Sequence, residues 1–377
     1  MSELLVNTIK KADGTGSLSV PAESGTVVTT ASPSLGRRNL IINGAMQVAQ
    51  RGTSNVNATG YKTVDRFELY EGSSPTYTFT SEQVSDAPDG FTKSFKVTAD
   101  SAATFTGSQN FGLRYKLEGQ DVQHLKYGTS SAQSVTISFW VKSSETGDFS
   151  LRVMNQSASG FRQYLTSYTI NSANTWEYKT ATITGDTVRA LDDGNTAEYV
   201  ISWELDTGAD DLSSAFSWTT DGANKSVTTQ VNLLAATNNT WQITGVQLEV
   251  GSVATPFEHR SYGEELALCQ RYYYKRTVGT NSNTTYGVGV VNSSTQCERV
   301  FAMHPVEMRA QPTCAISSCR IYDAGVAATV TTLGTQRNST SAMSQQFTAS
   351  SGGLTVGRAA LVIEDAGTGF LSMDAEL

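Results

Sequence analysis

Short runs in which apolar and polar residues alternate recur along most of this chain. In Val135–Val141 the odd positions are apolar, and in Phe111–Leu117 the apolar residues alternate with Arg114 and Lys116. A period of two is typical of a β-strand with one buried face. We read nine such runs as strands before residue 240: Tyr77–Ser81, Ser94–Thr98, Phe111–Leu117, Ser134–Lys142, Phe149–Met154, Tyr164–Ile170, Glu177–Ile183, Tyr199–Leu205 and Gln230–Leu234.

Polar, turn-forming segments such as SSETGD and LDDGNT separate these runs. No helical pattern interrupts them. Roughly ten strands without intervening helices predict two β-sheets packed face to face.

The stretch from Thr240 to Arg276 marks a change of architecture. Trp241 and Ile243 occupy odd positions in the sequence, whereas the apolar residues from Val246 to Val250 occupy even positions. A strand that changes face in this way needs one extra residue, and Gly245 is where a β-bulge costs least.

A helix is expected shortly after this strand. Ser261 and Glu264 have the spacing of a capping box, and Lys275 and Arg276 would suit the C-terminal end of the helix dipole. An apolar stripe at helical spacing follows the cap, and we expect it to serve as an oligomer or connector surface: Tyr262, Leu266, Cys269 and Tyr273.

The junction VQLEVGSVATPFEHRSYGEELALCQRYYYK resembles the sheet-to-helix junction of a family of tailed-phage tail fibre and minor tail proteins. The segments NLIINGAMQVAQRG and YKTVDRFELY are similar to the opening of that family, and HPVEMRAQPT and FLSMDAEL to its terminal domain. The resemblance covers roughly residues 38 to 276. It implies a jelly roll similar to carbohydrate-binding modules, in a bacteriophage virion component that is commonly a homotrimer.

We therefore predict an all-β chain with a jelly-roll β-sandwich, a short helix, a second, smaller C-terminal β domain and an extended N-terminal arm. The arm would span 1–37, the jelly roll 38–258, the connecting helix 259–276 and the C-terminal domain 277–377. The arm is too poor in apolar residues to order itself. It would be either a loose tail or, as the resemblance implies, the attachment to other phage tail proteins.

Charge and hydropathy exclude several kinds of partner. Lys and Arg total 27 against 35 Asp and Glu, a net charge of −8, so no nucleic acid partner is expected. No apolar run is long enough to cross a membrane, so no membrane insertion is expected. The N-terminus lacks a secretion signal pattern. The four cysteines have no recognised zinc spacing, and we expect free buried thiols rather than a Cys314–Cys319 bridge.

The sequence predicts a protein that is not an enzyme. Its three histidines stand apart from any nucleophile or metalloprotease motif. The adjacent acids at 192–193, 210–211 and 264–265 lie in polar segments or on the helix, where two neighbouring carboxylates are usually solvated. A glycosidase instead needs two carboxyl groups that face one bond.

Carbohydrate binding needs less: a flat aromatic face and a few fixed polar groups. Trp140 has the parity opposite to its buried neighbours, and Trp218 lies in a turn-rich insertion. We single out both as candidate carbohydrate-binding residues. The alternative is that each packs against a loop or a sister subunit.

We expect no cofactor and no metal site. The resemblance does leave open a structural calcium between the first and last strands of the jelly roll, for which Asp65 and Glu249 would be the carboxylates.

The resulting hypothesis is a phage tail fibre for host cell adhesion, located in the virion. It would act in receptor binding by holding host surface polysaccharide through several non-catalytic sites. A polysaccharide-degrading tailspike and a purely structural virion component are the alternatives, and a cellular adhesin is a third. The jelly roll or the C-terminal domain would contact the host.

Overall fold

The computed structural model describes residues 9–10, 17–18, 37–73, 75–157, 160–214, 216–277, 285–365 and 369–377. The chain divides into two compact units, Met1–Arg38 and Asn39–Leu377. In the first unit, strands β1 (Ile9–Lys10) and β2 (Ser17–Leu18) pair antiparallel. Most of the predicted attachment arm, 1–37, lies outside the described residues, so the arm stays a prediction.

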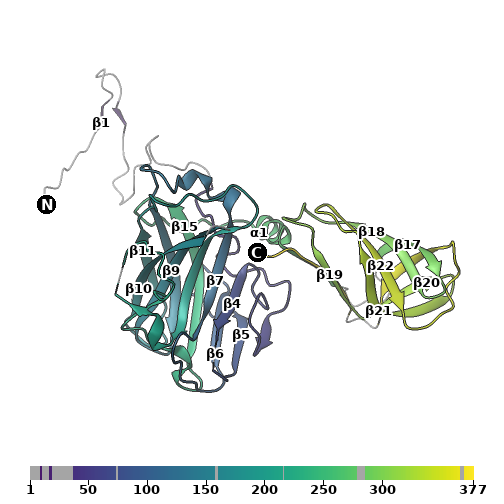
Figure 1. The fold of residues 1–377 in the computed structure, drawn as a ribbon, viewed down its shortest axis with the longest axis horizontal. Coiled ribbons are helices and arrows are strands. Elements are labelled where there is room, and N and C mark those ends of the chain that lie inside the picture. Colours follow the sequence, from purple (N-terminus) through teal and green to yellow (C-terminus); the bar gives the residue numbers. More distant parts are fainter. Residues whose placement is uncertain are drawn as a thin grey trace. The chain divides into compact units, whose positions relative to one another are not determined.

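The second unit begins with a sandwich of two β-sheets (Figure 1). The five-stranded sheet has the order β10-β9-β12-β7-β4, and the six-stranded sheet has the order β11-β8-β15-β6-β5-β3. The bounds are β3 Ser54–Val56, β4 Phe67–Gly72, β5 Phe79–Val84, β6 Ser94–Ala99, β7 Asn110–Glu118, β8 Val135–Ser143, β9 Gly147–Ser157, β10 Gly160–Ile170, β11 Glu177–Ile183, β12 Ala197–Thr207 and β15 Thr240–Val250. The predicted all-β fold, with a β-sandwich and a smaller C-terminal β domain, is confirmed.

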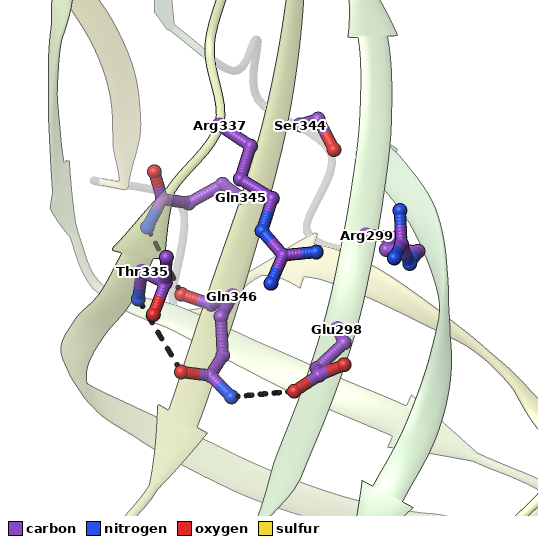
Figure 2. A pocket seen from close by; sticks show the side chains of 7 residues that line it. All are labelled: Glu298, Arg299, Thr335, Arg337, Ser344, Gln345 and Gln346. Carbon is purple, nitrogen blue, oxygen red and sulfur yellow. Dashed lines mark hydrogen bonds between the residues drawn. The ribbon is translucent and has the colours of Figure 1, made fainter.

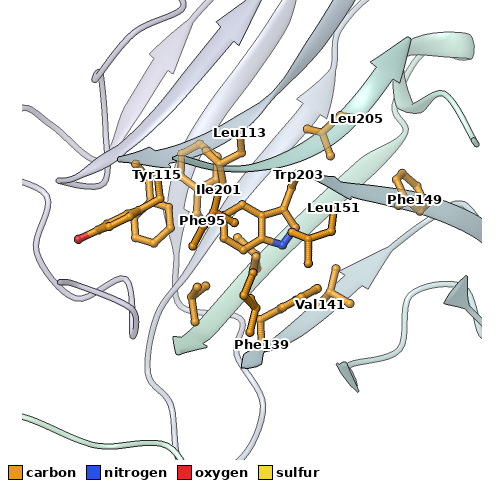
Figure 3. Packing of buried hydrophobic residues seen from close by; sticks show 14 of the residues in the cluster. Phe95, Leu113, Tyr115, Phe139, Val141, Phe149, Leu151, Ile201, Trp203 and Leu205 are labelled. Atoms are coloured by element: carbon orange, nitrogen blue, oxygen red, sulfur yellow. The ribbon is translucent and has the colours of Figure 1, made fainter. Parts of the chain in front are cut away.

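Alternating apolar residues of both sheets meet in one core. Trp203 of β12 and Trp241 of β15 have no exposed surface, and the ring centroids of Trp203 and Phe139 lie 5.7 Å apart in an edge-to-face contact. Figure 3 shows the Trp203 indole among Phe139, Leu151 and other side chains of the two sheets. Burial of each large apolar side chain contributes about 1.5–3 kcal/mol, so this contact layer is the main source of stability of the sandwich.

The bulge in β15 lies where the sequence predicted it. The register against β8 shifts between Thr244 and Gln247, and Gly245 has a φ of 62°. As a result the buried residues on the two sides of the bulge, Ile243 and Val246, both reach the core.

The predicted helix is too long by two turns. Helix α1 spans Tyr262–Gln270, with Ser261 as its N-cap accepting from the backbone N–H of Glu264. Tyr273 was predicted on the helix, but it begins strand β16 (Tyr273–Thr277). Pairing of β16 with β24 (Phe370–Asp374) competes successfully with the helix here, and a run of tyrosines favours a strand.

One predicted strand is absent. Gln230–Leu234 forms no strand in the described residues, and a 3-10 turn at Leu233–Ala235 places Leu233 and Leu234 in the core instead. Gln230 makes an isolated bridge with Asp148, but the run is apolar because its two leucines pack into the core. Strand β13 (Leu212–Ser213) and strand β14 (Ser226–Val227) form a small parallel pair nearby in the sequence.

The C-terminal region has two β parts. Strands β16, β24 and β19 (Thr313–Ser317) form a three-stranded sheet. Six strands then close into a barrel in the order β17-β18-β22-β21-β20-β23, some of which Figure 1 labels. Their bounds are β17 Thr285–Ser293, β18 Gln296–Met303, β20 Cys319–Asp323, β21 Val326–Gln336, β22 Ala342–Ala349 and β23 Ala359–Glu364.

All four cysteines are free and buried, as predicted. Among the described helices, none is both long and apolar enough to cross a membrane.

Candidate functional site

Trp140 lies on the outer face of the six-stranded sheet. Its neighbours Phe139 and Val141 are fully buried, while Trp140 itself is partly exposed. It pairs with Tyr178 of β11, and the two ring centroids are 5.4 Å apart. Tyr178 is 43% exposed. Two aromatic rings therefore lie side by side on two paired strands of the sheet.

A second aromatic group faces this pair from the loops. Phe91 precedes β6, and Phe257 and His259 belong to the segment that leaves β15. The ring centroid of Phe257 lies 5.0 Å from that of Phe91 and 4.8 Å from that of His259. Gly245 makes this approach possible, because a Cβ there would lie 2.7 Å from the Phe91 ring and 3.1 Å from Trp140.

Together these groups line an open cleft of about 720 Å³, which we call the aromatic cleft. Its apolar walls come from the rings just described and from Ala254 and Pro256. Asp89, Ser138, Thr255 and His259 supply the polar groups. Aromatic walls with a few polar groups are the usual composition of a small-molecule site.

A polar cluster continues the same face of the sheet. Lys142, two residues along β8 from Trp140, donates to the Asp86 carboxylate, and the Trp176 indole N–H donates to the same carboxylate at 3.2 Å. Lys142 also lies over the Trp176 ring, 5.3 Å from its centroid. Burial raises the pKa of Asp86, but the hydrogen bonds from Lys142 and Trp176 outweigh it and hold this pKa below its usual value.

Part of the outer face of the other sheet, around Arg152 and Gln163, is covered. Arg152 donates to Glu204 at 2.9 Å and to Gln163 at 3.1 Å within that sheet. Gln163 in turn donates through its side chain to the Asn224 carbonyl at 2.9 Å, and its backbone pairs with Thr219. The segment that includes Thr219 and Asn224 therefore lies on this face and occupies its polar groups.

Trp218, the second predicted carbohydrate-binding residue, has different surroundings. It packs against the core with its ring centroid 5.8 Å from that of Tyr127 and 5.7 Å from that of Tyr164. Its indole N–H donates to the Thr184 carbonyl at 2.7 Å. Trp218 does not line the aromatic cleft, and a role in binding carbohydrate stays a prediction.

The predicted connector residues are also separated. Tyr262 is 56% exposed, Leu266 is partly buried and Cys269 is fully buried in helix α1. Tyr273, in β16, packs under Arg51, whose guanidinium carbon is 3.6 Å from the ring centroid. Whether this surface joins subunits stays a prediction.

The two carboxylates considered for calcium have protein donors. Asp65 accepts from the backbone N–H and side-chain amide of Gln50, and Glu249 accepts from the N–H and hydroxyl of Thr255. Among the residues that the structure describes, no group of three or more His, Cys, Asp or Glu side chains could hold a metal ion. The calcium expectation stays a prediction.

A small hollow on the C-terminal barrel offers less room. Figure 2 shows Gln346 between Thr335 and Glu298, with its side-chain amide bonded to the Thr335 N–H at 3.3 Å and to the Glu298 carboxylate at 3.1 Å. The volume is about 10 Å³. A water molecule fills such a space, whereas a sugar ring does not fit.

The sequence pointed to Trp140 but not to its partners. Tyr178 has the parity opposite to that of Ala181 and Ile183, which marks it as outward-facing, yet only the register of β11 against β8 sets it beside Trp140. Phe91 and Phe257 lie in loops, where no periodicity marks them.

No family model matches this chain, and no curated protein matches it. Among solved structures, the chain is similar to the enzymatically active domain of bacteriophage CBA120 tailspike protein 4, at 14% identity and a TM-score of 0.30 over 56% of this chain and 21% of that one. It is also similar to the family 11 carbohydrate-binding module of Clostridium thermocellum Lic26A-Cel5E, at 15% identity and a TM-score of 0.28 over 53% of this chain and 95% of the module. A third is the CBM22-2 xylan-binding domain of Paenibacillus barcinonensis Xyn10C, at 16% identity and a TM-score of 0.29 over 56% of this chain and 97% of that domain. These TM-scores are low, so the fold rests on the strand order given above and the function on the site itself.

Proposed function

We propose that this chain is a phage tail fibre protein that binds host surface polysaccharide in the aromatic cleft without cleaving it. The observation that carries the proposal is the pairing of Trp140 with the exposed Tyr178 on the outer face of the sandwich, opposite Phe91 and Phe257. The phage assignment is supported by the resemblance of residues 38 to 276 to tail fibre proteins.

The chemistry of the cleft suits a sugar. One face of a pyranose ring carries C–H groups that pack on an aromatic face, while its hydroxyls require fixed donors and acceptors. Trp140 and Tyr178 supply the faces, and Asp89, Ser138 and His259 supply polar atoms beside them. Because the cleft is open, an internal segment of a long polymer can enter it.

The cleft also favours binding over hydrolysis. Glycosidases of the usual kind place two carboxyl groups on either side of the scissile bond. The side chains that line the cleft include one carboxylate, Asp89, which is exposed. A polysaccharide-degrading tailspike and a purely structural part remain the competing functions.

Weak individual sites would be enough in the assembled fibre. Three linked copies make the second and third binding events intramolecular, which raises avidity without stronger contacts. In this proposal the protein is a homotrimer in the virion, and residues 1–37 attach it to other tail proteins.

The experiment is to mix the purified full chain with polysaccharide extracted from the host surface and to measure both binding and release of reducing ends. Binding without release supports the proposal. Release of reducing ends would establish the tailspike alternative. Failure to bind either polysaccharide or whole host cells would leave a structural part.

A further inference from the structure

The walls of the aromatic cleft form a connected series of rings. Tyr178 contacts Trp140 with 5.4 Å between the ring centroids, and Phe91 contacts Phe257 at 5.0 Å. Gly245 joins the two pairs, because a Cβ there would lie 2.7 Å from the Phe91 ring and 3.1 Å from Trp140. A ligand in the cleft therefore meets aromatic groups from the sheet and from the loops.

The same cleft has an exposed acid at its wall. Among the described residues that line the cleft, Asp89 is the only acid, and there is no lysine or arginine. Asp89 stands at the tip of a turn, in which the Phe91 N–H donates to the Pro88 carbonyl at 3.0 Å and Gly90 has a φ of 88°. In the part of the chain that the structure describes, no hydrogen bond or ion pair occupies the Asp89 carboxylate. This carboxylate is therefore available to a ligand.

A lysine ammonium is already held by a ring and a carboxylate beside the cleft. Lys142 lies two residues along β8 from Trp140, and its Nζ is 5.3 Å from the centroid of the Trp176 ring. The Asp86 carboxylate accepts from the same Nζ and, at 3.2 Å, from the Trp176 indole N–H. The loop that supplies Asp86 also supplies Asp89, three residues later. The cleft thus contains the same two components, an aromatic face and an aspartate of this loop.

The nearby lysines do not occupy the rings of the cleft. Lys142 is held by Asp86, and Lys93 donates to the Ser85 hydroxyl at 2.9 Å. Neither lysine lines the cleft. His259 does, but histidine is mostly neutral above pH 7. With a net charge of −8 on the whole chain, the field at the cleft attracts cations and repels anions.

Aromatic faces beside a carboxylate are suited to an ammonium group. The face of each ring is the negative end of its quadrupole, so it attracts a cation, and sites built from several rings are typical for quaternary ammonium ligands. The carboxylate adds attraction for the same charge. A neutral sugar uses the ring faces but gains nothing from the charge of Asp89, and an anionic sugar is repelled by it.

We propose that the aromatic cleft binds a polysaccharide through an ammonium group that the polymer carries, either a primary amine or a quaternary ammonium substituent. The ammonium group packs on the faces of Trp140 and Phe91, with the Asp89 carboxylate as its counter-charge. Polymers whose substituents are all neutral or anionic bind more weakly. This inference rests on the proposed function, because it names the class of polysaccharide that the same cleft takes.

The test uses two pairs of small probes, each pair matched in shape. Choline is compared with dimethylbutanol, the alcohol in which carbon replaces the quaternary nitrogen, and ethanolamine is compared with propanol. The full chain with nitrogen-15-labelled tryptophan has five indole N–H groups, and Trp140→Phe identifies the signal of Trp140. Titrations are made at pH 8, where histidine is mostly neutral.

We expect at least one ammonium probe to shift the Trp140 signal at roughly 10-fold lower concentration than its neutral partner, as for cation–π attraction at desolvated rings. The tighter of the two ammonium probes shows whether a quaternary or a primary group is preferred. If neither ammonium probe binds better than its neutral partner, the inference is overturned.

Asp89→Asn tests the counter-charge. The amide keeps the shape of the side chain but not its charge, so this variant should weaken binding of the ammonium probe severalfold and leave binding of the neutral alcohol unchanged. The matched control is Asp193→Asn, which removes an exposed acid of the sandwich that does not line the cleft. Equal weakening of the charged and the neutral probe in Asp89→Asn would contradict a role for the charge.

These outcomes are separate from those of the proposed function. A chain that binds host polysaccharide in the cleft but does not prefer ammonium probes would overturn this inference and leave the proposed function standing. A chain that prefers ammonium probes but binds no polysaccharide would refute the proposed function and leave an ammonium site.

Discussion

The Arg66 guanidinium lies 3.4 Å from the centroid of the Tyr272 ring and forms an ion pair with Glu376. Arg66 comes from the start of the sandwich, and Glu376 follows the last strand, 310 residues later in the chain. Burial alone would lower the pKa of Arg66, but the adjacent Glu376 carboxylate together with Tyr115 and Tyr272 outweighs burial and raises this pKa well above its ordinary value. The C-terminal segment is thus held on the sandwich by a buried cation.

Glu376→Gln should destabilise the sandwich by about 3 kcal/mol, because it leaves the charge of Arg66 buried without its partner. All five tryptophans lie in the sandwich, so urea unfolding followed by tryptophan fluorescence reports this part of the chain. The matched control is Glu307→Gln on the exposed surface, which should change the free energy of unfolding by less than about 0.5 kcal/mol. Equal effects of the two substitutions would show that Glu376 is not important for stability.

Gly245→Ala should reduce polysaccharide binding more than it reduces stability. The added Cβ would contact the Phe91 ring and Trp140, and it would also sit at a φ of 62°. Gly251→Ala separates the contact of the added Cβ from the backbone strain. Gly251 also has a positive φ, but a Cβ there meets nothing within 4 Å. We expect loss of binding only in the first variant, measured by titration with polysaccharide. Equal loss in both would place the cause in the backbone rather than in the cleft.

Asp65 should make the stability of the sandwich depend on pH. Burial, opposed by hydrogen bonds from Gln50, raises the pKa of this carboxyl to about 6, against an ordinary value near 3.9. The folded state therefore keeps a proton that the unfolded state loses between about pH 4 and pH 6. The stability that this group contributes is full below pH 4 and is lost as the pH rises through 6.

The comparison variant for this effect is Asp65→Asn, which does not titrate. The difference in free energy of unfolding between wild type and variant should fall by about 3 kcal/mol between pH 4 and pH 7, from two pKa units at 1.36 kcal/mol each. A difference that does not change with pH would refute the raised pKa.

The four thiols should be unreactive in the folded protein. Burial raises the pKa of Cys297 to about 11 and those of Cys314 and Cys319 to about 12, and it raises that of Cys269 well above its ordinary value. Only the thiolate attacks a disulfide reagent. Titration with an aromatic disulfide should give no reactive thiol in native buffer and four in denaturant. Rapid reaction of any thiol in native buffer would contradict the buried positions.

The sequence was sufficient to predict an element where apolar and polar residues alternate with a period of two. Alternation in β7, β8 and β12 predicted both the strands and their buried faces, and the parity change predicted the bulge at Gly245. The sequence was insufficient where pairing between strands that are distant in the chain decides whether a segment is helix or strand. Tyr273 fits a helical stripe equally well, and only its pairing with Asp374, about 100 residues away, makes it part of a strand.

The candidate site shows the same division. The outward direction of Trp140 follows from parity, because its neighbours are core residues. Its pairing with Tyr178 depends on register between strands, and the position of Phe257 depends on how a loop folds back. Trp218 lies outside the strands, so no alternation predicts which way its side chain points. In the structure its indole N–H donates to the Thr184 carbonyl.

The most direct test of the central claim is calorimetric titration of host polysaccharide into the wild type and Trp140→Ala, with Phe216→Ala as the control for loss of an exposed aromatic ring. Removal of a central aromatic contact should weaken binding roughly 10-fold or more, equal to about 1.4 kcal/mol. We expect this loss for Trp140→Ala alone, with unchanged unfolding. Wild-type affinity in Trp140→Ala would contradict carbohydrate binding in the aromatic cleft.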